Sequence, residues 1–183
     1  ETARVTVDGK AAPVPDTETT PFASAVRFRP AMQFTARDVE GMKAVTDLID
    51  SQLPSPNIFY AVRITGKFSK VQTRSVPIQK KPYPELTEVV KSQPIFTFAE
   101  IDGVILGFRC PPLAKGLNVP GYHLHFLTDS RKSGGHLQGV SLGEVKIEIM
   151  PIREFRMVLP NTPDFDRLNL TRDTTEATAK VEK

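Results

Sequence analysis

The sequence predicts a strand-rich α/β protein of the α+β type, with two β-sheet subdomains and few helices. Apolar and polar residues alternate with a period of two through much of the chain, which is typical of half-buried strands. Helical spacing of apolar residues is confined to two segments. A chain of 183 residues can bury one substantial core or two small ones that share an interface. We therefore expect one compact unit, with subdomains at 1–94 and 95–183 and a boundary near Pro94.

Six segments alternate and are predicted as strands, in three consecutive pairs: 57–65 with 67–76, 95–101 with 104–110, and 145–150 with 153–159. Gly66 separates the members of the first pair. Asp102 and Gly103 form a strong two-residue hairpin signal in the second. Pro151 lies in the third pair and marks a bend or a sheet edge, because proline cannot donate to a β-ladder.

Two segments are predicted as helices. Residues 36–52 carry apolar residues on one face, with Asp38 available as a cap and Pro54 placed to end the helix. Residues 84–93 form a shorter candidate that Pro84 can open. The helices are therefore expected to be a minor part of the fold.

The charge pattern argues against a nucleic-acid partner. The net charge is +3 with a pI near 9.0, but the basic residues are scattered and no aromatic residues interleave with a basic stripe. No apolar run approaches the roughly 18 residues that a membrane span needs, so no membrane association is expected. A small anionic substrate suits the mild positive charge. No signal-like leader opens the sequence, which predicts a cytoplasmic location unless a secretory signal has been removed.

The single cysteine, Cys110, cannot form an internal disulfide. It lies in an apolar stretch, where a free thiol is usually buried and inert. We expect that role for Cys110.

All three histidines of the chain fall within a short segment. His123 and His125 alternate with apolar residues in a predicted strand over 121–126, so both imidazoles leave the same face. His136 follows the sequence Ser133-Gly134-Gly135, which is predicted to be a turn flexible enough to bring a third imidazole beside the pair.

Three imidazoles on one face predict a mononuclear metal site. Imidazole suits zinc, copper, iron and nickel, and three histidines with an open fourth position form the arrangement of catalytic zinc. A lone histidine is more often a surface residue or a hydrogen-bonded core residue. The clustering of all three favours the metal site over that interpretation.

A long motif surrounds these histidines: Gly107–Arg109, Ala114–Phe126 and Asp129–His136. Three further stretches lie in order along the chain: 19–23, 73–77 and 159–165. Together these motifs resemble the α-acetolactate decarboxylases, and the resemblance covers nearly the whole chain.

The resemblance implies the conversion of 2-acetolactate to acetoin and carbon dioxide at a Zn²⁺ ion, or another divalent transition metal, held by His123, His125 and His136. Zinc chelated by the hydroxyl and keto oxygens of the substrate withdraws electrons as the carboxylate leaves, and it stabilises the enediolate that results. No organic cofactor is then needed. The resemblance also implies a homodimer of two-domain α/β subunits with large sheets.

Further site residues follow only from the resemblance. Arg74 matches a family arginine that can hold the substrate carboxylate or the developing oxyanion. Glu182, with Glu176 as the alternative, matches a family carboxylate that transfers a proton. Glu1 is the candidate for another family glutamate, although its separation from Asp8 is two residues too long. Without the resemblance, all of these would be interpreted as exposed surface residues.

Two alternatives stay open. The family's usual N-terminal segment is missing and the stretch 10–17 is shorter than usual, so the sequence is either an incomplete record of a longer chain or a divergent member. A divergent member would be a decarboxylase-like metal-binding protein that acts on another 2-hydroxy-3-keto acid or is inactive. The pattern His-x-His with a later histidine also occurs in cupin-like metal oxygenases. The glutamate expected after the pair in a cupin is absent, since the nearest carboxylate is Asp129.

Overall fold

The computed structural model describes residues 3–18, 20, 22–80, 82, 84, 86–169 and 171. The strands are β1 (Ala3–Val5), β2 (Ala11–Pro13), β3 (Met32–Ala36), β4 (Phe59–Arg74), β5 (Ile95–Cys110), β6 (Gly121–Thr128) and β7 (Gly134–Ile152). The helices are α1 (Met42–Gln52), α2 (Leu86–Val89) and α3 (Pro163–Asp166), with 3₁₀ turns η1 (Val90–Ser92) and η2 (Pro112–Ala114). The predicted strand-rich class with few helices is confirmed.

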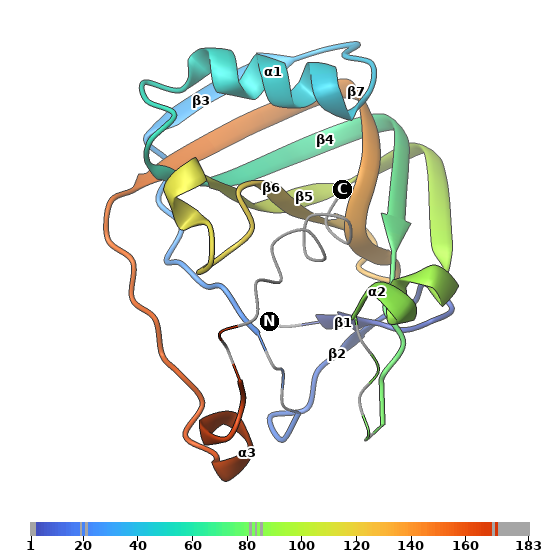
Figure 1. Cartoon of the computed structure of the whole chain (residues 1–183). Coiled ribbons are helices and arrows are strands. Elements are labelled where there is room, and N and C mark those ends of the chain that lie inside the picture. The colour runs from blue at the N-terminus through green and yellow to red at the C-terminus, as the bar shows by residue number, and fades with distance from the viewer. Residues whose placement is uncertain are drawn as a thin grey trace.

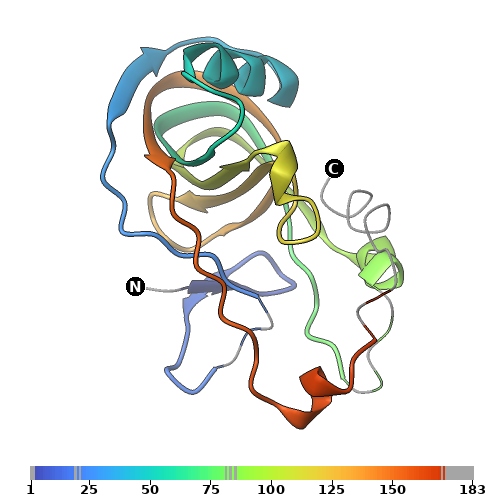
Figure 2. The same cartoon turned by 60° about the vertical axis from the view of Figure 1, so that its left-hand side comes forward.

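Five strands form one antiparallel sheet in the order β3-β7-β4-β5-β6 (Figure 1). The start of β7 also pairs with β6, so β4, β5, β6 and β7 close around a common interior, as Figure 2 shows. β1 and β2 form a separate two-stranded sheet. This small sheet joins the larger one, because the Ala11 N–H donates to the Lys132 carbonyl at 2.8 Å and the Ser75 hydroxyl donates to the Val5 carbonyl at 2.9 Å.

Pro94 lies between β4 and β5, which pair with each other along most of their length. The larger sheet therefore takes strands from both sides of the expected boundary. The division of the chain into units at 1–94 and 95–183 stays a prediction.

The interior of the closed sheet is the hydrophobic core. Leu124 and Phe126 of β6 are each 2% exposed, and Phe68 of β4 meets Phe126 edge to face with ring centroids 5.5 Å apart. Helix α1 lies over β3 and β7 (Figure 1) and buries Val45 and Ile49 completely. Full burial of such side chains contributes about 1.5 to 3 kcal/mol for each residue. The residues that alternate with Leu124 and Phe126 along β6 therefore lie on the outer face of the sheet, outside the core.

Helix α1 begins at Met42, later than the predicted start at Ala36. Ala36 instead belongs to β3 and pairs with β7. Asp38 has a left-handed φ of 53° and does not cap the helix, which begins after Gly41. The helix ends before Pro54, as predicted. The second predicted helix is formed in large part by α2 and η1.

β4 and β5 are each one long bent strand (Figure 1), which corrects the predicted break at Gly66 and the predicted hairpin at Asp102 and Gly103. Gly66 and Gly103 are cross-strand partners in a continuous ladder. A Cβ atom on Gly103 would lie 2.6 Å from the Leu127 carbonyl oxygen. Glycine at these positions permits a bend and a close backbone approach, which a local turn signal does not distinguish from a turn.

β7 ends at Ile152, and residues 153–159 form no strand, contrary to the prediction. Ile152 pairs with Phe59, the first residue of β4, so no described neighbouring strand continues beyond this point. Phe155 instead stacks on Phe59 with ring centroids 5.6 Å apart.

Within the described ranges, no helix is long and apolar enough to span a membrane.

Candidate metal centre

β6 carries two histidines on its outer face. Because Leu124 and Phe126 point into the core, His123 and His125 leave the opposite face, as the alternation predicts. Their Nε2 atoms lie 3.1 Å apart. Two imidazole nitrogens at this distance can share a proton or turn toward a common ion.

His136 of β7 completes the cluster. It is the cross-strand partner of His125, and its ring centroid lies 4.9 Å from that of His123 and 5.2 Å from that of His125. One ligand nitrogen from each of the three side chains lies within 4.8 Å of the others. The structure therefore brings together the three predicted metal ligands.

The turn between β6 and β7 is formed by residues 129–132, not by the predicted Ser133-Gly134-Gly135. Gly134 and Gly135 already belong to β7. Gly135 has a φ of 145°, and a Cβ atom there would lie 2.6 Å from the carbonyl oxygen of Arg74. These glycines allow β7 to approach its neighbours closely, and they place His136 instead of reversing the chain.

Arg74 lies at the end of β4 as the cross-strand partner of His136. It is 3% exposed, and its Nη1 donates to Oε1 of Gln93 at 2.7 Å. Its positive charge helps to lower the pKa values of His125 and His136, in keeping with its place on the strand beside His136. The structure thus brings Arg74 to the histidines, and it adds Gln93, a contact from a loop that no local sequence signal marks.

Burial is the largest cause that lowers the pKa of His125 to about 4 and that of His136 to about 2. The neighbouring imidazoles and Arg74 contribute to both shifts. His125 nevertheless remains accessible to solvent, so a ligand can reach its ring. Both imidazoles are neutral near pH 7, which is the form that binds a metal ion.

The predicted carboxylates Glu1, Glu182 and the alternative Glu176 lie outside the described residues. Within the described part of the chain, the histidine cluster is the one group of three His, Cys, Asp or Glu side chains close enough to hold a metal ion. Asp129 is exposed in the turn and does not belong to this group.

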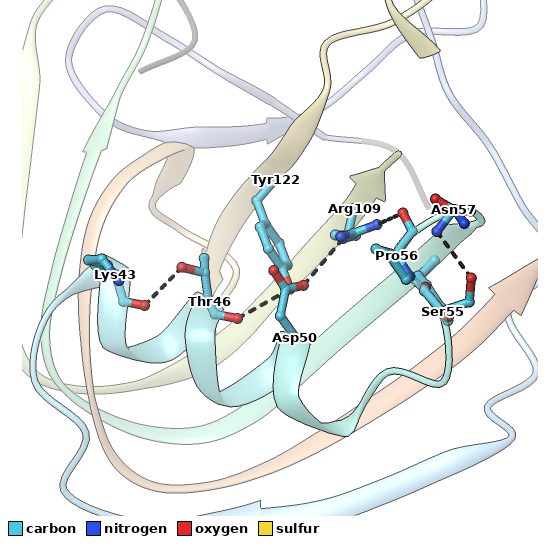
Figure 3. Close-up of polar contacts among 9 residues, drawn as sticks. Lys43, Thr46, Asp50, Ser55, Pro56, Asn57, Arg109 and Tyr122 are labelled. Atoms are coloured by element: carbon cyan, nitrogen blue, oxygen red, sulfur yellow. Dashed lines mark hydrogen bonds and ion pairs between the residues drawn. The ribbon is translucent and has the colours of Figure 1, made fainter. Parts of the chain in front are cut away.

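A polar network on the other side of β6 anchors the start of this strand (Figure 3). The Tyr122 hydroxyl donates to Oδ1 of Asp50 in α1 at 2.7 Å, and Nε of Arg109 donates to the same oxygen at 3.2 Å. Burial and the Asp50 carboxylate raise the pKa of Tyr122, which keeps the hydroxyl protonated as a donor. The network fixes the backbone next to His123, and an isolated Asp in a helix gives no sequence signal for it.

A cavity of about 1870 Å³ lies on the histidine side of the sheet. Its lining is largely apolar and includes Phe108, the cross-strand partner of His123. None of the three histidines is among its described lining residues. The three histidines therefore lie beside the cavity and do not line it.

Cys110 also lines the cavity and is 2% exposed. Burial raises the pKa of its thiol to about 11, in agreement with the predicted inert role.

A family model described as α-acetolactate decarboxylase matches residues 3–172 of this chain. The α-acetolactate decarboxylase of Brevibacillus brevis is 41% identical over 174 residues, which cover 95% of this chain and 61% of that protein. The α-acetolactate decarboxylase of Methanosarcina mazei is 42% identical over 182 residues, which cover 98% of this chain and 62% of that protein. The chain thus spans about three fifths of the length of these relatives.

The fold of this chain is also similar to solved structures. The α-acetolactate decarboxylase of Bacillus subtilis strain 168 superposes with a TM-score of 0.94 at 40% identity, over 98% of this chain and 77% of that one. A protein of unknown function from Staphylococcus aureus, described as similar to α-acetolactate decarboxylase, superposes with a TM-score of 0.93 at 26% identity, over 99% of this chain and 78% of that one.

Proposed function

Because this chain belongs to the α-acetolactate decarboxylase family, we propose that it catalyses the zinc-dependent decarboxylation of 2-acetolactate to acetoin and carbon dioxide. The observation that carries the proposal is the convergence of His123, His125 and His136 beside the guanidinium of Arg74. A metal site next to a buried cation suits a substrate that has two metal-binding oxygens and a carboxylate.

The donor set fits a first-row transition metal. Three imidazoles come from two paired strands, so their spacing is fixed by the sheet and not by a mobile loop. His125 and His136 are held neutral, which removes the competition of protons for the ligand nitrogens near pH 7. Zinc bound there would supply a Lewis acid that draws electron density from the oxygens of the substrate.

Arg74 is proposed to bind and orient the carboxylate. Its planar fork matches the two oxygens of a carboxylate, and its burial excludes water that would weaken the pairing. Gln93 accepts a hydrogen bond from Nη1 and so restrains the plane of the guanidinium. We infer that this contact positions the carboxylate before the carbon–carbon bond breaks.

A proton donor must complete the reaction. When carbon dioxide leaves, the electron pair of the broken bond stays on the substrate, and the carbon that carried the carboxylate must gain a proton to give acetoin. Glu182 is the proposed general acid, with Glu176 as the alternative. Glu1 is proposed as a second carboxylate at the site.

Two competing functions make different demands on this site. A related protein that acts on another 2-hydroxy-3-keto acid, or on none, would keep the metal site but not turn over 2-acetolactate. A cupin-like oxygenase would need a carboxylate ligand beside the histidines. Asp129, the nearest in sequence, does not belong to the ligand group, which favours the decarboxylase over the oxygenase.

We further propose that the active form is a homodimer, as the resemblance implies. Large apolar side chains are exposed along the segment after β7, where Phe155 is 50%, Val158 is 77% and Leu159 is 61% exposed. Apolar surface of this extent is usually covered by another protein surface. A cytoplasmic location, a small anionic substrate and the absence of a nucleic-acid or membrane partner complete the proposal.

The test is to incubate the zinc-loaded protein with racemic 2-acetolactate and to measure acetoin and carbon dioxide in equal amounts. We expect turnover that is lost in His123→Ala and in chelator-treated protein, and that returns when zinc is restored to the unmodified chain. A zinc-loaded protein that leaves 2-acetolactate unchanged would contradict the proposal.

A pair of arginine variants tests the second part of the site. Arg74→Ala should bind zinc and lose about 100-fold or more in turnover, the cost typical of removing one charge-stabilising group. Arg37→Ala is the matched control, because this arginine is an exposed partner of Glu144 on the surface. Equal activities of the two variants would remove Arg74 from the mechanism.

A further inference from the structure

One row of cross-strand partners crosses the metal centre. Arg74 pairs with His136, His136 pairs with His125, and His125 pairs with Leu106 of β5. Side chains of directly paired residues lie on the same face of a sheet. The row therefore begins with a buried cation, passes through two metal ligands and reaches an apolar side chain on β5.

β5 presents three apolar residues on the histidine face, which we call the β5 strip: Val104, Leu106 and Phe108. Phe108 is the cross-strand partner of His123, as Leu106 is of His125. Cβ atoms of such pairs lie about 4.5 to 5.5 Å apart, so the strip adjoins both ligands. On the side of β5, the two histidines of β6 therefore border an apolar surface.

Leu106 is 50% exposed although it lies beside the metal ligands. Its other neighbour, Arg63 of β4, pairs with Glu148 at 2.8 Å and stacks on Phe28 with its guanidinium carbon 4.8 Å from the ring centroid. The charge of Arg63 is thus committed to Glu148. Leu106 is left as the accessible apolar side chain at this edge of the centre.

We propose that Leu106 is a specificity-determining residue, whose side chain contacts the alkyl substituents of a metal-bound 2-hydroxy acid and limits their size. This inference rests on the proposed function for the identity of the substrate. Arg74 lies on one side of the ligands and Leu106 on the other. A carboxylate held toward Arg74 directs the alkyl groups of the same molecule toward Leu106.

Binding of two probes to the zinc-loaded protein tests the proposal without turnover. The probes are 2-hydroxy-2-methylpropanoate and the bulkier 2-ethyl-2-hydroxybutanoate, and their Kd values are measured by titration calorimetry. Leu106→Ala should shift the ratio of the two Kd values toward the bulkier acid by about tenfold or more, the discrimination that one or two methylenes give in an apolar pocket. Leu106→Phe should shift the ratio in the opposite direction.

Leu113→Ala is the matched control, because Leu113 is 64% exposed in η2 and lies outside the β5 strip. All variants should retain one zinc per chain, since leucine is not a ligand. A ratio in Leu106→Ala equal to that of Leu113→Ala overturns the role of Leu106, and so does a zinc-loaded protein that binds neither acid. These results are independent of the decarboxylation assay: a shifted ratio without acetoin formation supports Leu106 and contradicts the proposed substrate.

Discussion

Gly135→Ala is predicted to damage the metal site without touching a ligand. The φ of 145° at Gly135 is strained for any L side chain, at a cost of about 1 to 3 kcal/mol. The new Cβ would lie 2.6 Å from the Arg74 carbonyl oxygen, whereas ordinary contact begins at 3.4 Å, so the backbone must move by about 0.8 Å. His136 is the next residue, and metal–ligand distances tolerate only about 0.2 Å.

The assay is competition for zinc against a chelator of known affinity, together with urea unfolding of the metal-free proteins. We expect zinc affinity to fall by about 10- to 100-fold, as it does when groups that orient a ligand are lost. Gly139→Ala in the same strand is the control, because its Cβ would meet Gln72 at an ordinary 3.8 Å. The reasoning is refuted if Gly135→Ala binds zinc as tightly as Gly139→Ala.

Three further predictions concern the surroundings of the site. Cys110, with a pKa of about 11 and 2% exposure, should resist alkylation at pH 8 in the native protein and react fully in urea; rapid native alkylation would contradict its burial. Tyr122→Phe removes the hydrogen bond to Asp50 and should lower the free energy of unfolding by about 1 to 2 kcal/mol, measured in urea, and an unchanged stability would show that the network does not anchor β6. Gln93→Ala should raise KM for 2-acetolactate by a larger factor than it changes the affinity for zinc, because Gln93 contacts Arg74 and not the histidines. Gln93→Glu restores an acceptor to the guanidinium. An unaltered KM in Gln93→Ala would exclude a positioning role.

The sequence predicts the strands well because alternation reports which residues face the core. β6 agrees with the prediction, and the apolar residues of α1 are buried where the helical spacing places them. Two of the errors occur at glycine, and others are the helix start predicted at Ala36, which belongs to β3, and the strand predicted over 153–159. Gly66 and Gly103 are signals for a turn in a local reading, but in the folded chain they allow two long strands to bend around a closed sheet. Local patterns cannot distinguish these uses, because the difference lies in the approach of a distant strand.

The site shows the same limit. His123 and His125 are predicted from their spacing alone, since a strand fixes their common face. The place of His136 depends on the register between β6 and β7, and that of Arg74 on the register between β4 and β7. Gln93 and Leu106 could not be predicted, because their partners are far away in sequence and neither residue type suggests a site.

The three histidines lie where β6 meets β7, which we call the β6–β7 seam and which has the shortest pairing within the closed sheet. β6 and β7 pair through only three residues, from His125 with His136 to Leu127 with Gly134, whereas β5 and β6 pair through eight. An ion held by histidines of both strands would cross-link this seam, so its binding free energy would add to the stability of the closed form. The glycines at the start of β7 serve closure and ligand placement together. Changes that open the seam would therefore be expected to impair metal binding before they unfold the core, which β4 and β5 hold through a much longer ladder.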